Sequence, residues 1–469
     1  MTAMTLEAEG KEHLDALAGA NHAFAHLYPG DRPARQPVHT VYGGAHLFKA
    51  ETPRRLGELA LDSLAAYARD PAELAAGVGL ARSPALDDAA LAALYARVRA
   101  KLQREPVEDF RLDFEDGFGA RPDAEEDAVA DTAAREVARG MREGGLPPFI
   151  GIRIKSFGEE CKGRGARTLG LFIDRLLADS GGHLPDGFVV TLPKVTVAEQ
   201  PRALVRLLEI LERRHHLPAG TLRLEIMIEV TQAVLGADGR SPLPGFLQAC
   251  EGRCTGAHFG TYDFTASCNI TAAHQAMDHP LCQLATGLMV LAYAGTGIFL
   301  SDGATNIMPV GPHRASADRP LSPAQLDQNR AAVHAAWHTS HRHIRRSLQS
   351  GLYQGWDLHP AQLPVRFATC YAFFREGFAA AAERLRSFLD KAAQATLVGE
   401  VFDDAATGQG LLNFFLRALN SGAIDQADLA ATGLTRDEFA LRSFAKILAA
   451  RRDRLRAAPA APPATFQGK

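Results

Sequence analysis

Residues 110–117 read Phe110-Arg111-Leu112-Asp113-Phe114-Glu115-Asp116-Gly117. Successive side chains of a β-strand point to opposite faces, so this run would carry three apolar side chains on one face and an arginine with two acids on the other. Charges without a partner are costly to bury. The run therefore predicts a strand whose charged face lines a polar cavity or meets a cation.

Strand-like runs of this kind alternate along the chain with helical stretches rich in alanine and leucine. The eight runs are Val38–Tyr42, Phe110–Phe114, Ile150–Ile154, Phe188–Leu192, Leu222–Glu229, Thr255–Phe259, Ile298–Ser301 and Tyr353–Leu358. Helices are expected between them at Pro53–Ala68, Asp123–Gly140, Thr168–Ala178, Glu199–Arg214 and Ser322–Gln349, among others. This alternation predicts a parallel sheet with helices outside, and eight repeats predict an α/β fold, the (β/α)8 or TIM barrel. An open doubly wound sheet is the alternative.

Four parts are expected along the chain. Residues 1–36 form a helical N-terminal extension, which the prolines and glycine of Pro29–Pro33 end. Residues 37–365 form the barrel. Residues 366–456 form a C-terminal helical appendage, with helices expected at Phe367–Lys391, Gly408–Asn420 and Arg436–Arg456. Residues 457–469 are rich in alanine and proline and are expected to be a disordered tail.

Composition excludes several classes of partner. The 469 residues carry a formal net charge of −3, so neither a nucleic-acid groove nor an anionic membrane partner is expected. No apolar run reaches the roughly 18 residues of a membrane span. Residues 1–30 lack the apolar core of a signal peptide, and the six cysteines lack zinc-ribbon spacing. We expect a cytoplasmic protein with reduced thiols whose partners are small molecules or other protein chains.

Two further runs repeat the pattern of the first. Ile150–Lys155 and Leu222–Glu229 each alternate aliphatic with charged side chains. The outer face of a barrel packs on helices, so the charged side chains would point into the lumen. Those deep in their strands, Arg111, Arg223 and Glu225, are expected to form an internal salt-bridge network.

The charged residues that end these strands have a different expected role. Glu115, Arg153 and Glu229 would lie at the C-terminal rim, where barrel enzymes carry out catalysis. Asp263 follows the next strand, so its carboxylate can converge with that of Glu229. Two carboxylates without a histidine or cysteine pattern favour Mg²⁺ or Mn²⁺ over zinc. Glu115 or Asp116 would hold metal-bound water, and Arg153 would bind a substrate carboxylate.

The rim motifs resemble those of the citrate lyase β-subunit-like, or HpcH/HpaI aldolase, superfamily, with some similarity to malate synthase. The matching motifs are Asp113-Phe114-Glu115-Asp116, Ile152-Arg153-Ile154, Leu192-Pro193-Lys194-Val195, Met227-Ile228-Glu229-Val230, Phe259-Gly260-Thr261-Tyr262-Asp263, Ile298–Gly303 and Gly355–Gln362. They occur in family order over residues 38–365. Tyr42-Gly43-Gly44 departs from the typical first-strand ending, and Gly236–Leu247 widens the gap between the two metal carboxylates.

The resemblance implies a metal-dependent carbon–carbon lyase or aldolase that acts on a 2-oxo acid or an acyl-CoA-type substrate through an enolate stabilised by Mg²⁺ or Mn²⁺. The implied metal ligands are Glu229 and Asp263. The implied catalytic residues are Arg153, Glu115, Asp116 and Asp403, and the implied substrate-binding residues are Arg153, Lys194, Gly260 and Thr261. Relatives often form trimers or hexamers, so a homo-oligomer is expected.

Some roles stay open at this stage. The general acid or base is Asp403, Asp404 or His359, each of which has a structural alternative. Lys155 and Lys194 either neutralise substrate charge or pair with nearby acids. His334, His338 and His341 share one helix face with a spacing that zinc can use, but a solvated helix face is expected instead.

Two other functions remain in competition with the lyase. A malate-synthase-like acyltransferase would condense an acyl-CoA with a 2-oxo acid, although no clear CoA site is evident in the sequence. A barrel that binds metal and metabolite without turnover is the alternative outside catalysis.

Overall fold

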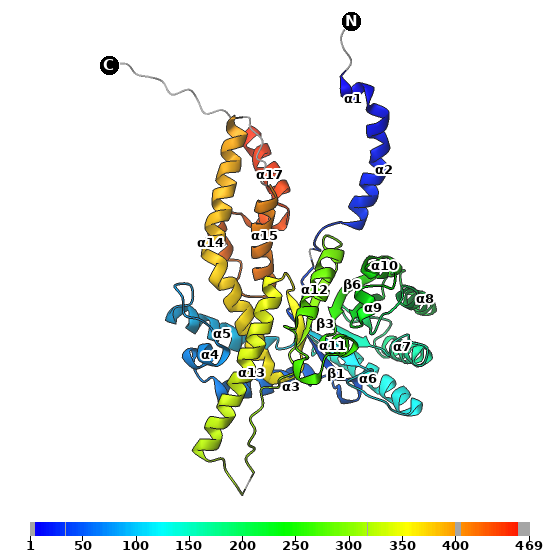
Figure 1. The fold of residues 1–469 in the computed structure, drawn as a ribbon, viewed down its shortest axis with the longest axis vertical. Coiled ribbons are helices and arrows are strands. Elements are labelled where there is room, and N and C mark those ends of the chain that lie inside the picture. The colour runs from blue at the N-terminus through cyan, green and yellow to red at the C-terminus, as the bar shows by residue number, and fades with distance from the viewer. Residues whose placement is uncertain (1–4, 33, 317, 399–404, 458–469) are drawn as a thin grey trace, which may run out of the picture.

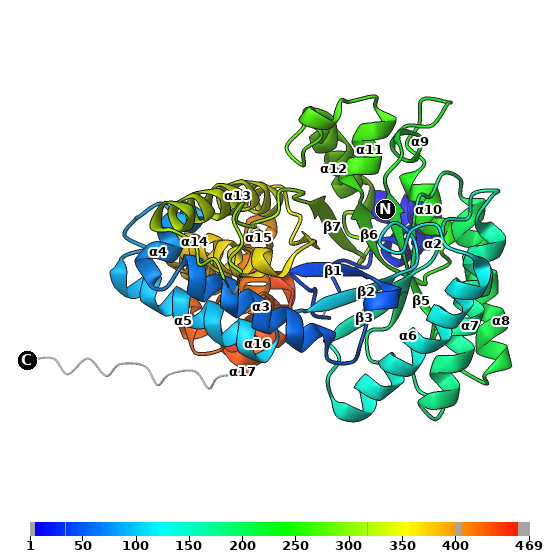
Figure 2. The same ribbon diagram turned by 90° about the horizontal axis from the view of Figure 1, so that it is seen from below.

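A closed barrel of parallel strands forms the body of the computed structural model (Figure 2). The structure describes residues 5–32, 34–316, 318–398 and 405–457, and within them eight strands pair in sequence order, with the first also pairing with the last. The strands are β1 (His39–Gly44), β2 (Asp109–Asp113), β3 (Phe149–Arg153), β4 (Val189–Leu192), β5 (Arg223–Ile228), β6 (Cys254–Phe259), β7 (Phe299–Ala304) and β8 (Gln354–Asp357). The predicted α/β barrel is confirmed, and the open sheet is excluded.

The lumen holds the charged network that the strand pattern predicts, with one exception. Arg111 is buried and donates to the Glu225 carboxylate at 2.6 Å, and it also pairs with Asp109. His258 contacts the same Glu225 oxygen at 3.0 Å. The expectation for Arg223 is wrong, because this residue begins β5 and donates instead to the Gly252 carbonyl at 2.9 Å. The register places it at the N-terminal edge of the strand, outside the lumen network.

Helices cover the barrel between successive strands (Figures 1 and 2). They are α3 (Thr52–Tyr67), α4 (Pro71–Val78), α5 (Asp88–Arg104), α6 (Asp123–Glu143), α7 (Lys162–Asp179), α8 (Glu199–Arg214), α9 (Thr231–Val234), α10 (Leu243–Ala249), α11 (Thr261–Ser267), α12 (Pro280–Tyr293) and α13 (Pro323–Gln349). Short 3-10 helices lie at Ala45–Leu47, Ala272–His274, Pro360–Gln362 and Asp428–Thr432. The connection from β1 to β2 therefore carries three helices instead of one. No helix in the described part of the chain is both long and apolar enough to cross a membrane.

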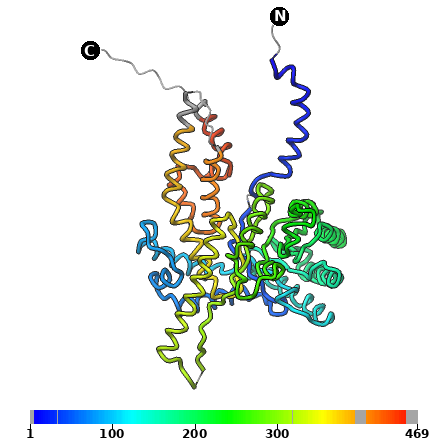
Figure 3. Tube along the Cα trace, in the orientation of Figure 1, coloured from blue at the N-terminus to red at the C-terminus, as the bar shows by residue number. Residues whose placement is uncertain are grey.

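The described N-terminal and C-terminal helices extend from the same side of the barrel (Figures 1 and 3). The N-terminal helices are α1 (Leu6–Glu9) and α2 (Lys11–Leu27), and the C-terminal ones are α14 (Leu363–Val398), α15 (Ala405–Asn420), α16 (Arg436–Ala440) and α17 (Phe444–Ala457). Asn420 contacts the backbone of Gln36, which precedes β1, so α15 reaches the N-terminal face of the barrel. The single helix predicted over Arg436–Arg456 is wrong, because a break with Arg442 at a φ of 51° separates α16 from α17.

Candidate functional site

The charged strand ends converge on a cavity at the C-terminal rim of the barrel. Its volume is about 320 Å³, and residues from β1, β2, β3, β7 and β8 and from the segments after β2, β5 and β6 line it. The predicted site residues among its lining are Asp116, Arg153, Glu229, Gly260, Thr261 and Asp263. Two more predicted residues, Glu115 and Lys194, contact this set directly. Asp403 and Asp404 lie outside the described residues.

Glu229 is a deeply buried carboxylate of this cavity. It follows β5 and is 1% exposed. Burial raises its pKa to about 8, an effect that Asp263 and Glu115 reinforce and Arg153 opposes. One carboxylate oxygen, Oε1, accepts the backbone N–H of Lys194 at 2.6 Å. The other, Oε2, faces Gly260, where a Cβ would come closer than the 3.0 Å that real Cβ atoms keep. Glycine at this position therefore lets the backbone approach the Glu229 side chain more closely than any other residue could.

Arg153, at the end of β3, is held by a carboxylate of the neighbouring strand. Its Nε donates to Asp113 Oδ1 at 2.7 Å, and Nη2 donates to Asp113 Oδ2. Asp113 is fixed in turn by the backbone N–H groups of Glu115 at 2.9 Å and Gly117 at 2.7 Å. The Arg153 guanidinium was expected to bind a substrate carboxylate, but two of its nitrogens, Nε and Nη2, already donate to Asp113. Arg153 Nη1 remains, 3.2 Å from Glu115 Oε2 and 3.5 Å from Asp116 Oδ2.

Lys194, after β4, joins carboxylates from three parts of the rim. Its backbone has a φ of 51°, in the left-handed region that is uncommon for residues other than glycine. Its ammonium contacts Glu115, lies 3.0 Å from Asp116 Oδ1 and lies 3.6 Å from Asp263 Oδ2. These carboxylates raise the pKa of the lysine above its usual range despite partial burial, which opposes them.

Two hydroxyl groups of the cavity, one of them missed by the sequence reasoning, are free to bind a ligand. Tyr42 was not predicted as a site residue, whereas Thr261 was expected to bind substrate. Tyr42 Oη and Thr261 Oγ1 are buried, and neither has a hydrogen-bond partner among the residues that the structure describes. Tyr42 stacks on Trp356, with 4.4 Å between ring centroids, and the Arg153 guanidinium lies 5.0 Å from its ring. Buried hydroxyls in proteins normally have a partner, so both groups can donate to a ligand. The departure at Tyr42-Gly43-Gly44 from the family pattern was the available signal for Tyr42.

The other open candidates lie apart from this cavity or are engaged elsewhere. Lys155 pairs with Glu126 at 2.9 Å. His359 Nδ1 accepts the N–H of Ala361, and burial lowers its pKa. The three α13 histidines each contact a different group: the Tyr67 carbonyl for His334, the Ala76 carbonyl for His338 and the Thr369 hydroxyl for His341. They do not form a zinc site.

The residues present fit a hard divalent cation. No group of three or more His, Cys, Asp or Glu side chains in the described part of the chain is arranged around a common metal position. Mg²⁺ does not need such a group, because it keeps several waters and uses one or two carboxylates. Glu229 and Asp263 supply oxygen donors to the cavity. This donor set suits Mg²⁺ or Mn²⁺.

Comparison with known proteins assigns the family. A family model described as a domain of unknown function, DUF6986, matches residues 17–447. The chain belongs to the DUF6986 family. No curated protein matches it. Among solved structures, this DUF6986 chain is similar to a citrate lyase from Burkholderia xenovorans LB400, with 17% identity, a TM-score of 0.49, and coverage of 86% of this chain and 97% of the other.

Two further solved structures resemble the DUF6986 chain more weakly. The magnesium/glyoxylate complex of Haloferax volcanii malate synthase has 14% identity and a TM-score of 0.42, covering 70% of this chain and 74% of the other. Protein CitE of Mycobacterium tuberculosis in complex with magnesium and acetate has 15% identity and a TM-score of 0.35, covering 71% and 89%. Likeness at this level carries no argument about function.

Proposed function

We propose that this chain is a Mg²⁺-dependent carbon–carbon lyase or aldolase of the HpcH/HpaI type, acting on a 2-oxo acid or an acyl-CoA-type substrate. The observation that carries the proposal is the meeting of Glu229, Asp263 and Arg153 in one cavity at the C-terminal rim. Two acids supply oxygen ligands, and an arginine beside them supplies a fixed positive charge. This combination suits substrates that develop negative charge on oxygen when a carbon–carbon bond breaks or forms.

Each residue of the cavity has a role in this proposal. Glu229 and Asp263 would hold Mg²⁺, with Glu115 and Asp116 accepting hydrogen bonds from its waters. When bound, the ion would supply positive charge that stabilises an enolate oxygen. Arg153 Nη1 and the Lys194 ammonium would neutralise the substrate carboxylate. These charge interactions are strongest around Arg153 and Glu229, which are buried away from water.

The protein also positions the substrate. Tyr42 Oη and Thr261 Oγ1 have no hydrogen-bond partner in the described part of the chain and would donate hydrogen bonds to substrate oxygens. Asp113 fixes the guanidinium of Arg153 through two hydrogen bonds, so this charge needs no reorganisation when the substrate binds. Asp403 stays a prediction as the general acid or base.

A ligand-binding test separates the metal assignment from turnover. Mg²⁺ with oxalate, a planar mimic of a pyruvate enolate, should raise the melting temperature of the wild type. Glu229→Gln should abolish the shift, whereas Glu199→Gln, on the exposed face of α8, should keep it. A full shift in Glu229→Gln would show that the metal assignment is wrong. If the shift depends on Glu229, exchange of pyruvate methyl protons with D₂O then separates an enzyme from a barrel that only binds.

One observation favours the acyltransferase as a second candidate. A mostly apolar cavity of about 240 Å³ lies beside the site and shares Tyr42 and Leu358 with its lining. Phe48, Leu56 and Leu363 form part of its wall, and an acyl chain would fit such a surface. Release of free CoA from acetyl-CoA only in the presence of glyoxylate would favour this candidate over the aldolase.

A further inference from the structure

The N-terminal helix α2 has an apolar face that no other described part of the chain covers. All 17 of its residues are exposed. Leu14, Leu17, Phe24 and Tyr28 are between 43% and 64% exposed, and with Asn21 they repeat at alternating intervals of three and four residues. This is the spacing of a coiled-coil seam, in which a single asparagine sets the register. Isolated helices of this length are marginally stable in water, so α2 needs a partner.

Helix α12 on the barrel carries a matching seam. Leu281, Leu284 and Leu291 are 40%, 59% and 77% exposed, and Leu288 completes the same spacing of three and four residues. The helix contains no Asp, Glu, Lys, Arg or His, whereas the outer helix α8 has acids and arginines along its length. An outer helix of a barrel normally presents charged residues to water. The uncharged surface of α12 therefore indicates a covered face.

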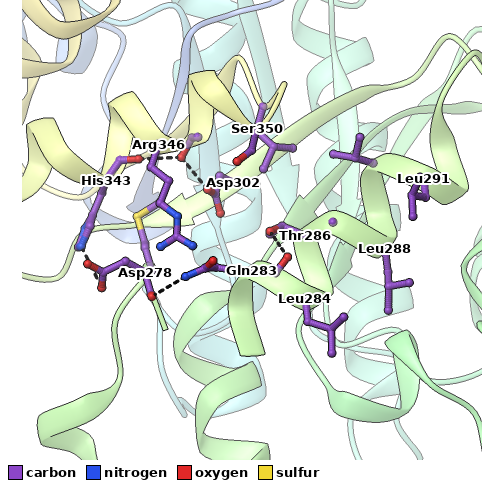
Figure 4. A pocket seen from close by; sticks show the side chains of 15 residues that line it. Asp278, Gln283, Leu284, Thr286, Leu288, Leu291, Asp302, His343, Arg346 and Ser350 are labelled. Atoms are coloured by element: carbon purple, nitrogen blue, oxygen red, sulfur yellow. Dashed lines mark hydrogen bonds and ion pairs between the residues drawn. The ribbon is translucent and has the colours of Figure 1, made fainter. Parts of the chain in front are cut away.

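A groove lies beside this row of leucines and offers a docked helix a second contact surface (Figure 4). Its volume is about 500 Å³, and it lies between α12 and α13, with Leu284, Leu288 and Leu291 on one side and Arg346 on the other. The Arg346 guanidinium makes no hydrogen bond or ion pair with any residue that the structure describes. Asp278 and Asp302 also line the groove, so a docked helix meets charges of both signs there, and residues 6–15 offer four acids and one lysine.

The base of α2 is fixed at the end of α12. The Gly30 N–H donates to the Gly295 carbonyl at 2.8 Å, and Arg32 donates to the Cys254 carbonyl at 2.8 Å. From this point α2 extends away from the barrel, and so away from its own α12 (Figure 1). The two seams therefore meet end to end in one copy and cannot cover each other.

We propose that α2 of one copy docks along α12 and the α12–α13 groove of a second copy, so that the chain forms a two-fold dimer by exchanging its N-terminal helices. A two-fold axis near Gly295 would place each α2 beside the partner's α12, forming two identical contacts. The helices have matching lengths, about 26 Å for α2 and about 21 Å for α12 at 1.5 Å per residue. Matched spacings of three and four residues let the side chains of the two helices interdigitate.

Mass measurement on the full chain tests this proposal. The wild type should sediment as a dimer, at twice the 50.4 kDa of one chain. Two double variants test the contact. The arm variant carries Leu17→Glu with Phe24→Glu, and the groove variant carries Leu284→Glu with Leu291→Glu. Each should raise the dimer dissociation constant at least about 30-fold, which is the effect of losing one interface hot spot. These positions are exposed in the single chain, so the melting of the monomer should not change. The control Ile210→Glu, on exposed α8, should remain dimeric.

Mixing the two variants gives the decisive result. A mixed dimer keeps one intact contact, between the unaltered arm of the groove variant and the unaltered groove of the arm variant. A tagged arm variant should therefore capture the groove variant in a 1:1 complex, while neither variant binds itself. The proposal would be overturned if the wild type were a monomer or a larger closed oligomer. It would also be overturned if either double variant remained a dimer, or if the two variants failed to pair on mixing.

Discussion

Replacing Gly260 by alanine should weaken metal binding by moving Glu229. A Cβ at residue 260 would come closer than 3.0 Å to both Cβ and Oε2 of Glu229. Ordinary van der Waals contact begins near 3.4 Å, so Glu229 has to move by about 1 Å to restore it. Rotation of the carboxylate cannot relieve this clash, because the Cβ of Glu229 is attached directly to the backbone at the end of β5. The shift also strains the 2.6 Å hydrogen bond from the Lys194 N–H.

Metal sites tolerate about 0.5 Å of displacement, and loss of correct ligand orientation costs about 10- to 100-fold in metal affinity. We therefore expect Gly260→Ala to raise the Mn²⁺ dissociation constant by that factor and to lower the free energy of unfolding by about 1–3 kcal/mol through overpacking. Isothermal titration with Mn²⁺ and urea unfolding measure the two effects. Gly245→Ala, where a new Cβ meets nothing within 4 Å, is the matched control. Mn²⁺ affinity of Gly260→Ala within twofold of wild type would refute the reasoning.

Three further predictions follow from buried or crowded groups. Arg111→Ala leaves the Glu225 carboxylate without its cation, so urea unfolding should show a loss of about 3–5 kcal/mol; a loss below 1 kcal/mol would mean that water or a proton replaces the arginine. Burial lowers the pKa of His341 to about 4, below the usual histidine value of about 6.5, so the folded state binds fewer protons than the unfolded chain; stability should fall by about 2–3 kcal/mol as pH drops from 6.5 to 4, and His341→Gln should remove that part of the pH dependence in thermal melts. Gly303→Ala places a Cβ against Thr261 Oγ1 and should lower the melting temperature, and Thr261→Ala in the same chain should restore most of it.

The strands could be predicted because the pattern of apolar and polar residues that forms a strand lies within a few consecutive residues. Short strand-like runs between helical stretches placed all eight within a few residues of their bounds, and the alternation of apolar and charged side chains in two of them assigned Arg111 and Glu225 to the lumen. Arg223 was misplaced because position along the strand, and not the alternation, decides whether a side chain lies inside the barrel. The cavity lined by Glu229 and Asp263 followed from the order of the strands.

Other features depend on tertiary contacts that the sequence pattern does not carry. No glycine or proline marks the break between α16 and α17; Phe444 instead packs where Gly408 has no side chain. The pairing of Arg153 with Asp113 depends on the direction of a guanidinium, which alternation leaves open. The Tyr42 and Thr261 hydroxyls have no hydrogen-bond partner among the described residues, and this can be recognised only when all neighbouring side chains are placed.

The position of Lys194 has a consequence for how the rim can open. Its amide is bonded to the carboxylate after β5, while its ammonium touches acids that follow β2 and β6. Loops that share one residue in this way cannot loosen independently, because any displacement of Lys194 releases several carboxylates at once. Local opening at this end of the barrel should therefore be cooperative, and the Lys194 amide proton should exchange with solvent at the same rate as its neighbours across four strand ends.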